Sequence, residues 1–211
     1  MTKKNLYYLH GFGVTATNPD VFVDIVRAFP GYNELHINLN DRDVNGDLHV
    51  SPLSEQTRRA ELLASGAGAG DILITHSQGA LVAALANLPR LRKIVMLAPP
   101  PYASSKKMLE RIKNRGGDLL NGVWKFPSVN GATRWVPQDY LHELEQIDAL
   151  VAYSKLAAHQ QVVVIEALDD EVLTTHDMSG VQGAEIVKIR ADHNFTDGSR
   201  ARLISTLQTV L

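Results

Sequence analysis

Three kinds of side chain in this sequence have the types and the order that nucleophilic catalysis requires. Ser77 lies within Thr-His-Ser-Gln-Gly at residues 75–79, acids gather at residues 169–171, and His193 follows later in the chain. A serine hydroxyl is a poor nucleophile unless a base takes its proton and a third group orients that base. Ser77 as a nucleophile therefore requires a histidine and a carboxylate beside it in the fold.

The residues around Ser77 predict a structure that would expose its hydroxyl. Residues 72–75 form a short apolar run typical of a buried strand, and residues 80–86 are rich in alanine and leucine, as in a helix. A tight strand-to-helix turn strains its central residue and lifts that side chain above the sheet. The helix N-terminus also supplies free N–H groups and a positive dipole end, which suit a developing oxyanion.

The acids and the histidine each follow a predicted strand. Asp169 and Asp170 come just after the apolar run of residues 161–166, and His193 comes just after that of residues 185–189. Active sites in parallel sheets lie beyond the carboxyl ends of the strands. We therefore expect these side chains to lie at the same edge of the sheet as Ser77.

The segment around Ser77 resembles the nucleophile elbow of the α/β-hydrolase family, Gly-x-Ser-x-Gly. The order serine, acid, histidine is also that of the family, and the resemblance covers nearly the whole chain. The sequence departs from the family's elbow at Thr75, which replaces the first glycine. A β-branched residue at that crowded point can widen the elbow, but we expect it to be tolerated because the other catalytic positions are intact.

By the same resemblance, the catalytic triad is Ser77, Asp170 and His193. The family's acid position reads Gly-x-x-Asp after a strand, and residues 167–170 match it with alanine in place of glycine. That register selects Asp170 rather than Asp169 as the carboxylate that orients the histidine.

His-Gly-Phe-Gly at residues 10–13 is similar to the family's oxyanion loop. This likeness implies that the backbone N–H groups of Phe12 and Gln78 bind the oxyanion. No metal or cofactor is implied, since His176-Asp177 and the pair Asp41 and Asp43 lack the spacing of a ligand set.

Strands and helices alternate along the chain, which predicts the fold class. We expect strands at residues 6–9, 34–39, 72–75, 93–97, 161–166 and 185–189, and helices from Asn18-Pro19 to about Phe29, from Ser54 to about residue 65, and at residues 80–86 and 199–211. Mainly apolar strands that alternate with helices are typical of a parallel sheet covered on both faces. The prediction is one α/β domain over residues 1–211, a three-layer sandwich with a mostly parallel sheet.

Residues 102–155 break this alternation and are expected to form a small insertion over the rim of the site. Aromatic runs at residues 123–126 and 133–136 flank Asn130-Gly131, a pattern typical of a β-hairpin. We hypothesise that three aromatic side chains line the acyl pocket, with a purely structural role in the hairpin as the alternative: Trp124, Phe126 and Trp135. The basic stretch at residues 105–115 is interpreted as a solvated helix face, and a basic lid at a membrane surface is the alternative.

Length and composition exclude several classes of protein. The 211 residues are 45% hydrophobic and 21% charged, with a net charge of −2 and no cysteine. A net charge this small does not indicate a basic surface that binds nucleic acid. The absence of cysteine excludes disulfides, thiolate metal sites and cysteine nucleophiles. No stretch predicts a signal peptide or a membrane span, so a cytoplasmic location is expected.

The sequence thus predicts a serine hydrolase that acts on a small-molecule carboxylic ester, or a related acyl bond, through an acyl-enzyme. A thioesterase, a peptidase or a carbon–carbon hydrolase with the same triad is the alternative within enzymes. Outside enzymes, the alternative is a binding module on the same fold. Substrate and oligomeric state are not predicted, because a fold does not determine a substrate.

Overall fold

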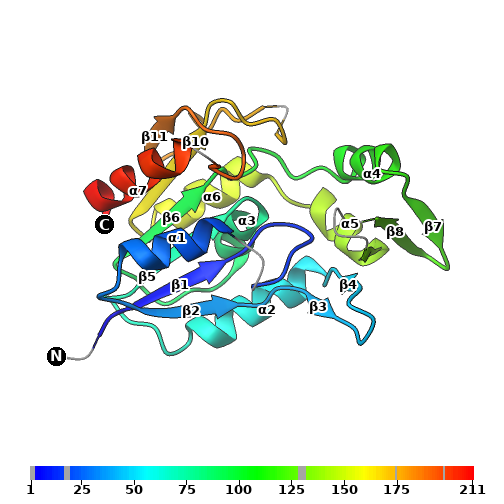
Figure 1. The fold of residues 1–211 in the computed structure, drawn as a ribbon, viewed down its shortest axis with the longest axis horizontal. Coiled ribbons are helices and arrows are strands. Elements are labelled where there is room, and N and C mark those ends of the chain that lie inside the picture. The colour runs from blue at the N-terminus through cyan, green and yellow to red at the C-terminus, as the bar shows by residue number, and fades with distance from the viewer. Residues whose placement is uncertain (1–2, 17–19, 128–131, 174, 197) are drawn as a thin grey trace.

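A six-stranded parallel sheet forms the centre of the computed structural model, which describes residues 3–16, 20–127, 132–173, 175–196 and 198–211 (Figure 1). Its strands are β1 (Asn5–Leu9), β2 (Asn33–Ile37), β5 (Ile72–His76), β6 (Lys93–Leu97), β10 (Val162–Ala167) and β11 (Glu185–Ile189). They lie in the order β11-β10-β6-β5-β1-β2, and every neighbouring pair is parallel. The predicted parallel sheet is confirmed.

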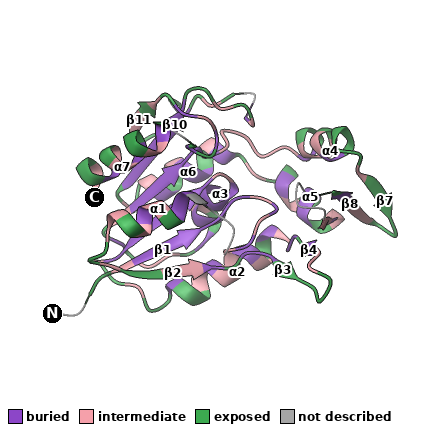
Figure 2. Ribbon diagram, viewed as in Figure 1, coloured by how far each residue is buried: buried purple, intermediate pink, exposed green. Residues whose placement is uncertain are grey.

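Helices cover both faces of this sheet, which gives the expected three-layer sandwich. On one face lie α1 (Asp20–Ala28) and α7 (Gly198–Val210), and on the other α2 (Leu53–Ala64), α3 (Gln78–Leu85) and α6 (Ala149–Ala157). Successive strand side chains point to opposite faces: Tyr8 packs in the core under α1 and α7, and Tyr7 in the core under α2 and α3. Figure 2 shows the central strands buried. The expected helix start at Asn18-Pro19 lies outside the described residues.

A second, five-stranded sheet lies beyond the carboxyl ends of the main strands, where the insertion was expected (Figure 1). It contains β7 (Asp118–Leu120), β8 (Val123–Pro127) and β9 (Thr133–Pro137), with β8 and β9 antiparallel as predicted. The proposed turn at Asn130-Gly131 lies outside the described residues. We call this sheet, together with α4 (Ser105–Asn114) and α5 (Gln138–Glu145), the roof.

The roof also contains two short strands in a segment for which the sequence pattern predicts neither a strand nor a helix. Within residues 40–52, β3 (Asp41–Arg42) and β4 (Leu48–His49) pair with each other, and β4 pairs with β9, so the order is β3-β4-β9-β8-β7. On the far side, the carboxylate of Glu143 in α5 accepts hydrogen bonds from the N–H and hydroxyl of Ser54 in α2, at 3.0 and 2.6 Å. The β4–β9 pairing therefore joins residues 41–49 to the insertion, and the Ser54–Glu143 bonds join the roof to the sandwich.

Helix α6 falls inside the predicted insertion of residues 102–155 but packs against α3. Tyr153 and Leu156 of α6 belong to the main core. Among the helices of the described residues, none has the length and apolarity that crossing a membrane would require.

Candidate active site

Ser77 lies in a strained turn between β5 and α3. Its φ of 51° and ψ of −123° are a conformation that non-glycine residues rarely adopt. The turn is tight because the backbones nearly touch: a Cβ on Gly79 would lie 2.4 Å from the carbonyl oxygen of Leu9. Thr75 fits without a glycine because its side chain is fully buried within β5 and its hydroxyl lies 3.4 Å from the carbonyl oxygen of Val95.

Hydrogen bonds join Ser77 to His193 and His193 to Asp170, so the structure brings the three predicted residues together. His193 Nε2 lies 3.0 Å from Ser77 Oγ, and His193 Nδ1 lies 2.6 Å from Asp170 Oδ2. Asp170 follows β10 and His193 follows β11, as expected from the strand ends. Within the described part of the chain, Asp169 forms no hydrogen bond to the His193 ring, and its backbone N–H donates to the carbonyl of Ala191 at 3.0 Å.

The Asp170 carboxylate is held in its ionised form. Burial alone would raise its pKa, but the hydrogen bond to His193, the charge of that ring and two backbone N–H groups outweigh burial and lower it. Those N–H groups belong to Val172 and Leu173, and each donates to Oδ1 at 2.8 Å. An ionised carboxylate at Nδ1 keeps the proton on that nitrogen, which leaves Nε2 as a proton acceptor facing Ser77.

His76, beside the nucleophile, supports His193 rather than Ser77. Its Nε2 lies 2.9 Å from the carbonyl oxygen of His193, and the ring is buried. Burial, and then the charge of His193, lower the pKa of His76 to about 4. His76 is therefore neutral near pH 7 and donates from Nε2, which fixes the loop that carries His193.

The loop after β1 lies directly against the nucleophile. A Cβ on Gly11 would lie 3.2 Å from Ser77 Cβ. His10 braces this loop: its Nε2 accepts from the N–H of Leu39 at 2.9 Å, so its Nδ1 carries the proton and donates to the carbonyl of Gly11 at 2.9 Å. Burial lowers the pKa of His10 to about 4, which keeps this tautomer neutral.

Phe12 and Gln78, the predicted oxyanion residues, both line the pocket at Ser77. In the part of the chain that the structure describes, the backbone N–H groups of Phe12 and Gln78 donate no hydrogen bond, so both are available to an oxyanion. The side chain of Gln78 is locked by partners that sequence reasoning missed: it donates to Gln56 Oε1 at 2.9 Å and accepts from the hydroxyl of Tyr140 at 3.0 Å. No sequence motif marks these two partners, which come from α2 and α5.

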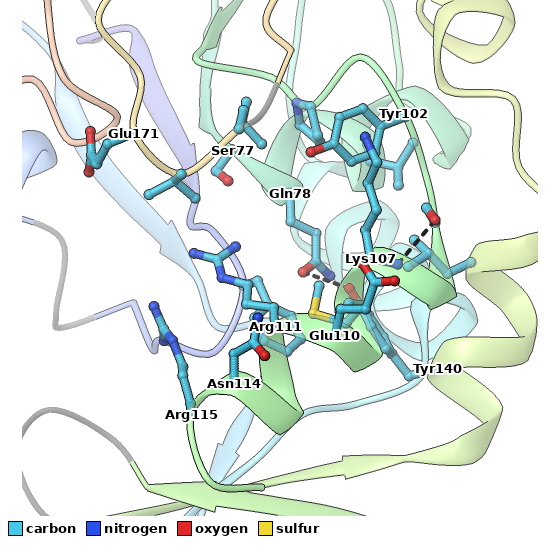
Figure 3. Close-up of a pocket in the computed structure, with 18 residues that line it drawn as sticks. Ser77, Gln78, Tyr102, Lys107, Glu110, Arg111, Asn114, Arg115, Tyr140 and Glu171 are labelled. Carbon is cyan, nitrogen blue, oxygen red and sulfur yellow. Dashed lines mark hydrogen bonds between the residues drawn. The ribbon is translucent and has the colours of Figure 1, made fainter.

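The pocket at Ser77 has a volume of about 610 Å³ and opens between the sandwich and the roof (Figure 3). Its apolar lining includes Leu81, Met108 and Leu144. Polar and charged side chains from α4 and its flanks form the facing wall: Tyr102, Ser104, Lys107, Glu110, Arg111, Asn114 and Arg115. The basic stretch interpreted as a solvated helix face is therefore a wall of the site.

The three aromatic residues expected in the acyl pocket do not line it in the described part of the chain. Phe126 is buried and stacks on Phe12 with ring centroids 6.5 Å apart. Trp135 stacks on His49 and donates from Nε1 to Asp47 at 3.1 Å, and Trp124 lies under Lys113. The acyl-wall hypothesis is not supported, because these rings pack within and beneath the roof instead.

Among the described residues, no group of three His, Cys, Asp or Glu side chains could hold a metal ion.

Comparisons with known proteins agree with this architecture. No family model and no curated protein sequence matches the chain. Among solved structures, it is similar to the esterase domain of a Rhodothermus marinus protein (TM-score 0.67, 15% identity, 100% of this chain and 87% of that one). It is also similar to Est1E from Butyrivibrio proteoclasticus (0.66, 14%, 99% and 88%) and to a lipase-esterase related protein from Clostridium acetobutylicum (0.67, 16%, 100% and 95%). Over its whole length, the chain has the α/β-hydrolase fold.

Proposed function

We propose that this protein is a serine hydrolase that cleaves a carboxylic ester, or a related acyl bond, of a small molecule through an acyl-enzyme. The observation that carries the proposal is the continuous hydrogen-bonded path from Asp170 through His193 to Ser77 Oγ. Strain at Ser77, a neutral His76 and glycines that allow close backbone approach all support the same role. The esterases and lipases among the similar structures are consistent with it.

In the proposed first half-reaction, Ser77 Oγ attacks the carbonyl carbon while His193 Nε2 takes the hydroxyl proton. The negative charge that develops on the carbonyl oxygen is bound by the N–H groups of Phe12 and Gln78, each worth about 3 kcal/mol of transition-state stabilisation. When the carbon–oxygen bond to the leaving group breaks, His193 gives its proton to that group, and the acyl-enzyme remains.

In the second half-reaction, His193 takes a proton from water, which attacks the acyl-enzyme and passes through the same oxyanion site. Collapse of this intermediate releases the carboxylic acid and returns the proton to Ser77. Asp170 stabilises the imidazolium in both halves without taking its proton.

Labelling with a fluorophosphonate probe, followed by mass spectrometry of the labelled peptide, tests this proposal. We expect the label on Ser77, and we expect Ser77→Ala to lose both labelling and p-nitrophenyl ester hydrolysis with its fold unchanged. Ser65→Ala is the matched control, because Ser65 is exposed and lines no pocket described here. Full esterase activity in Ser77→Ala would disprove the proposal.

The bond class is tested with one acyl group in three linkages. An oxygen ester, a thioester and an anilide of the same acid separate an esterase from a thioesterase and a peptidase by their relative kcat/KM. A protein that binds these compounds, is not labelled and hydrolyses none of them would be a binding module.

A further inference from the structure

We propose that the substrate carries an oxyanion group, a carboxylate or a phosphate, on its leaving-group side, and that Arg111, Arg115 and Arg134 bind this group. This inference deepens the proposed hydrolase function and rests on it.

Two hollows meet at Ser77, and the three arginines lie around the second. That hollow has a volume of about 460 Å³ and is lined by His76, His193 and Asn194 as well as by the three arginines. Arg111 and Arg115 line both hollows, whereas Arg134 lines only this one in the described residues. Figure 3 shows Arg111 and Arg115 extending from α4 toward the end of the site where Ser77 and Glu171 lie.

None of these three guanidinium groups forms an ion pair with a carboxylate in the part of the chain that the structure describes. Arg134 donates from Nε to the carbonyl of Gly13 at 2.7 Å and lies over the ring of Phe126. Arg200, which lines the same hollow, differs from them because it is paired with Asp24 at 2.7 Å. The fold therefore neutralises one arginine of this hollow and leaves three cations facing it.

Two of these cations are also partly removed from water. Burial, and then the charge of Arg115, lower the pKa of Arg111. Burial, and then the charges of Arg115 and Arg111, lower that of Arg134. Like charges held together in a partly dry site are unfavourable, and a bound oxyanion relieves both the repulsion and the lost hydration. Guanidinium groups match carboxylate and phosphate oxygens with two parallel hydrogen bonds.

The carboxylates near the second hollow do not neutralise the three arginines. Glu171 lines both hollows, but it is exposed and its Oε2 accepts from the N–H of His193 at 3.1 Å. Glu110 lines only the first hollow. Asp170 acts electrostatically on Arg111, but its carboxylate is hydrogen-bonded to His193 and to two backbone N–H groups.

The position of His193 indicates which half of the substrate is charged. In acyl transfer the histidine must reach the leaving group in order to protonate it, so that group lies on the side of the imidazole. His193 lines the second hollow, whereas the first hollow has, besides its charged residues, the apolar side chains of Leu81, Met108 and Leu144. An apolar acyl group suits the first hollow, and a charged alcohol suits the second.

Three acetyl esters of phenols that differ in their para substituent test the charge preference. They are 4-acetoxybenzoate, 4-acetoxyphenyl phosphate and the neutral methyl 4-acetoxybenzoate, with each kcat/KM divided by the rate constant for hydroxide hydrolysis. We expect at least one anionic ester to exceed the neutral one by about tenfold or more, as a charge-assisted hydrogen bond implies, and added salt to reduce the advantage. The two anionic esters distinguish a carboxylate from a phosphate.

Arg111→Gln and Arg115→Gln should each reduce the ratio of anionic-ester to neutral-ester kcat/KM severalfold. Lys106→Gln removes the same charge from an exposed position on the same helix that lines neither hollow, and it should leave the ratio unchanged. Arg115 is exposed, so its replacement tests the proposal even where Arg111→Gln lowers stability.

Equal normalised rates for all three esters would overturn the inference and leave the hydrolase function intact. A preference for charge only on the acyl side, for p-nitrophenyl hemisuccinate over p-nitrophenyl acetate, would overturn it as well. Calorimetric binding to Ser77→Ala separates the two proposals: that variant should bind the anionic esters more tightly than the neutral one whether or not the wild-type protein turns them over. Equal binding of charged and neutral esters would refute the inference by itself.

Discussion

Replacing Gly79 with alanine tests the packing that forms the nucleophile turn. The new Cβ would lie 2.4 Å from the carbonyl oxygen of Leu9 and 2.8 Å from that of His10, against 3.4 Å or more for an ordinary contact. Leu9 is the last residue of β1, which is held between β2 and β5, and His10 follows it directly, so these backbone atoms have little room to shift. Because the clash falls on backbone atoms, we expect Gly79→Ala to lower the free energy of unfolding by about 3 kcal/mol or more, at the upper end of overpacking costs. Urea unfolding followed by circular dichroism measures this loss.

Two further alanine substitutions complete the series. At Gly11 the new Cβ would lie 3.2 Å from Ser77 Cβ, so a shift of a few tenths of an ångström relieves it. We expect a stability loss of about 1 kcal/mol, but about tenfold lower kcat, because the shift falls on the nucleophile and on the adjoining loop. At Gly66 no atom lies within 4 Å of the new Cβ, so this control should change stability by less than about 0.5 kcal/mol.

The ranking of the three variants is the decisive result. If Gly79→Ala unfolds at the same urea concentration as Gly66→Ala, the close approach of the turn to β1 is not a constraint on the fold. If Gly11→Ala keeps the wild-type kcat, contact between this loop and Ser77 does not affect catalysis.

Three other measurements address the site and the roof. Asp170→Asn should lower kcat by about 10⁴-fold, because the histidine tautomer is no longer fixed, and Asp169→Asn should lower it far less. A larger loss in Asp169→Asn than in Asp170→Asn would identify Asp169 as the acid. The pKa values of His10 and His76 fall from 6.5 to about 4 in the fold, so the unfolded chain binds more protons in that window. The stability that each neutral ring contributes is present above pH 6.5 and lost as the pH falls toward 4, by about 3 kcal/mol each; unfolding midpoints that stay constant from pH 7.5 to 4.5 would contradict this. Trp135→Ala should lower the free energy of unfolding by about 2 kcal/mol. It should leave the rank order of kcat/KM for acetyl, butyryl and octanoyl esters unchanged, and an altered rank order would show that this ring contacts the acyl group.

The grouping of Ser77, His193 and Asp170 could be predicted from the sequence because each of these residues follows a strand. Ser77, Asp170 and His193 follow the strands β5, β10 and β11, and a parallel sheet brings the carboxyl ends of its strands to one edge. The sequence pattern identifies the strand ends, and the parallel sheet brings those ends together. The order of strands and polar residues along the chain was therefore sufficient to predict that the three side chains meet.

The sequence did not predict the wall of the pocket or the construction of the roof. A basic amphipathic helix has the same pattern whether its charged face meets solvent or a substrate, so Arg111 and Arg115 gave no local signal. The strand at Leu48–His49 is only two residues long, and its partner in β9 lies more than eighty residues away. Pairing of this kind depends on the tertiary structure and not on a period in the sequence.

The pairing of β4 with β9 limits how this protein can be shortened or recombined. Leu48, Phe126 and Val136 belong to the same buried cluster as the core of the sandwich. Excision of residues 118–137 would therefore expose apolar surface at Leu48 and leave the backbone of β4 without its neighbour, an edge prone to pair with other chains. A chimaera that exchanges the roof to change specificity must therefore exchange residues 41–49 together with the insertion, because β4 and β9 belong to the same sheet.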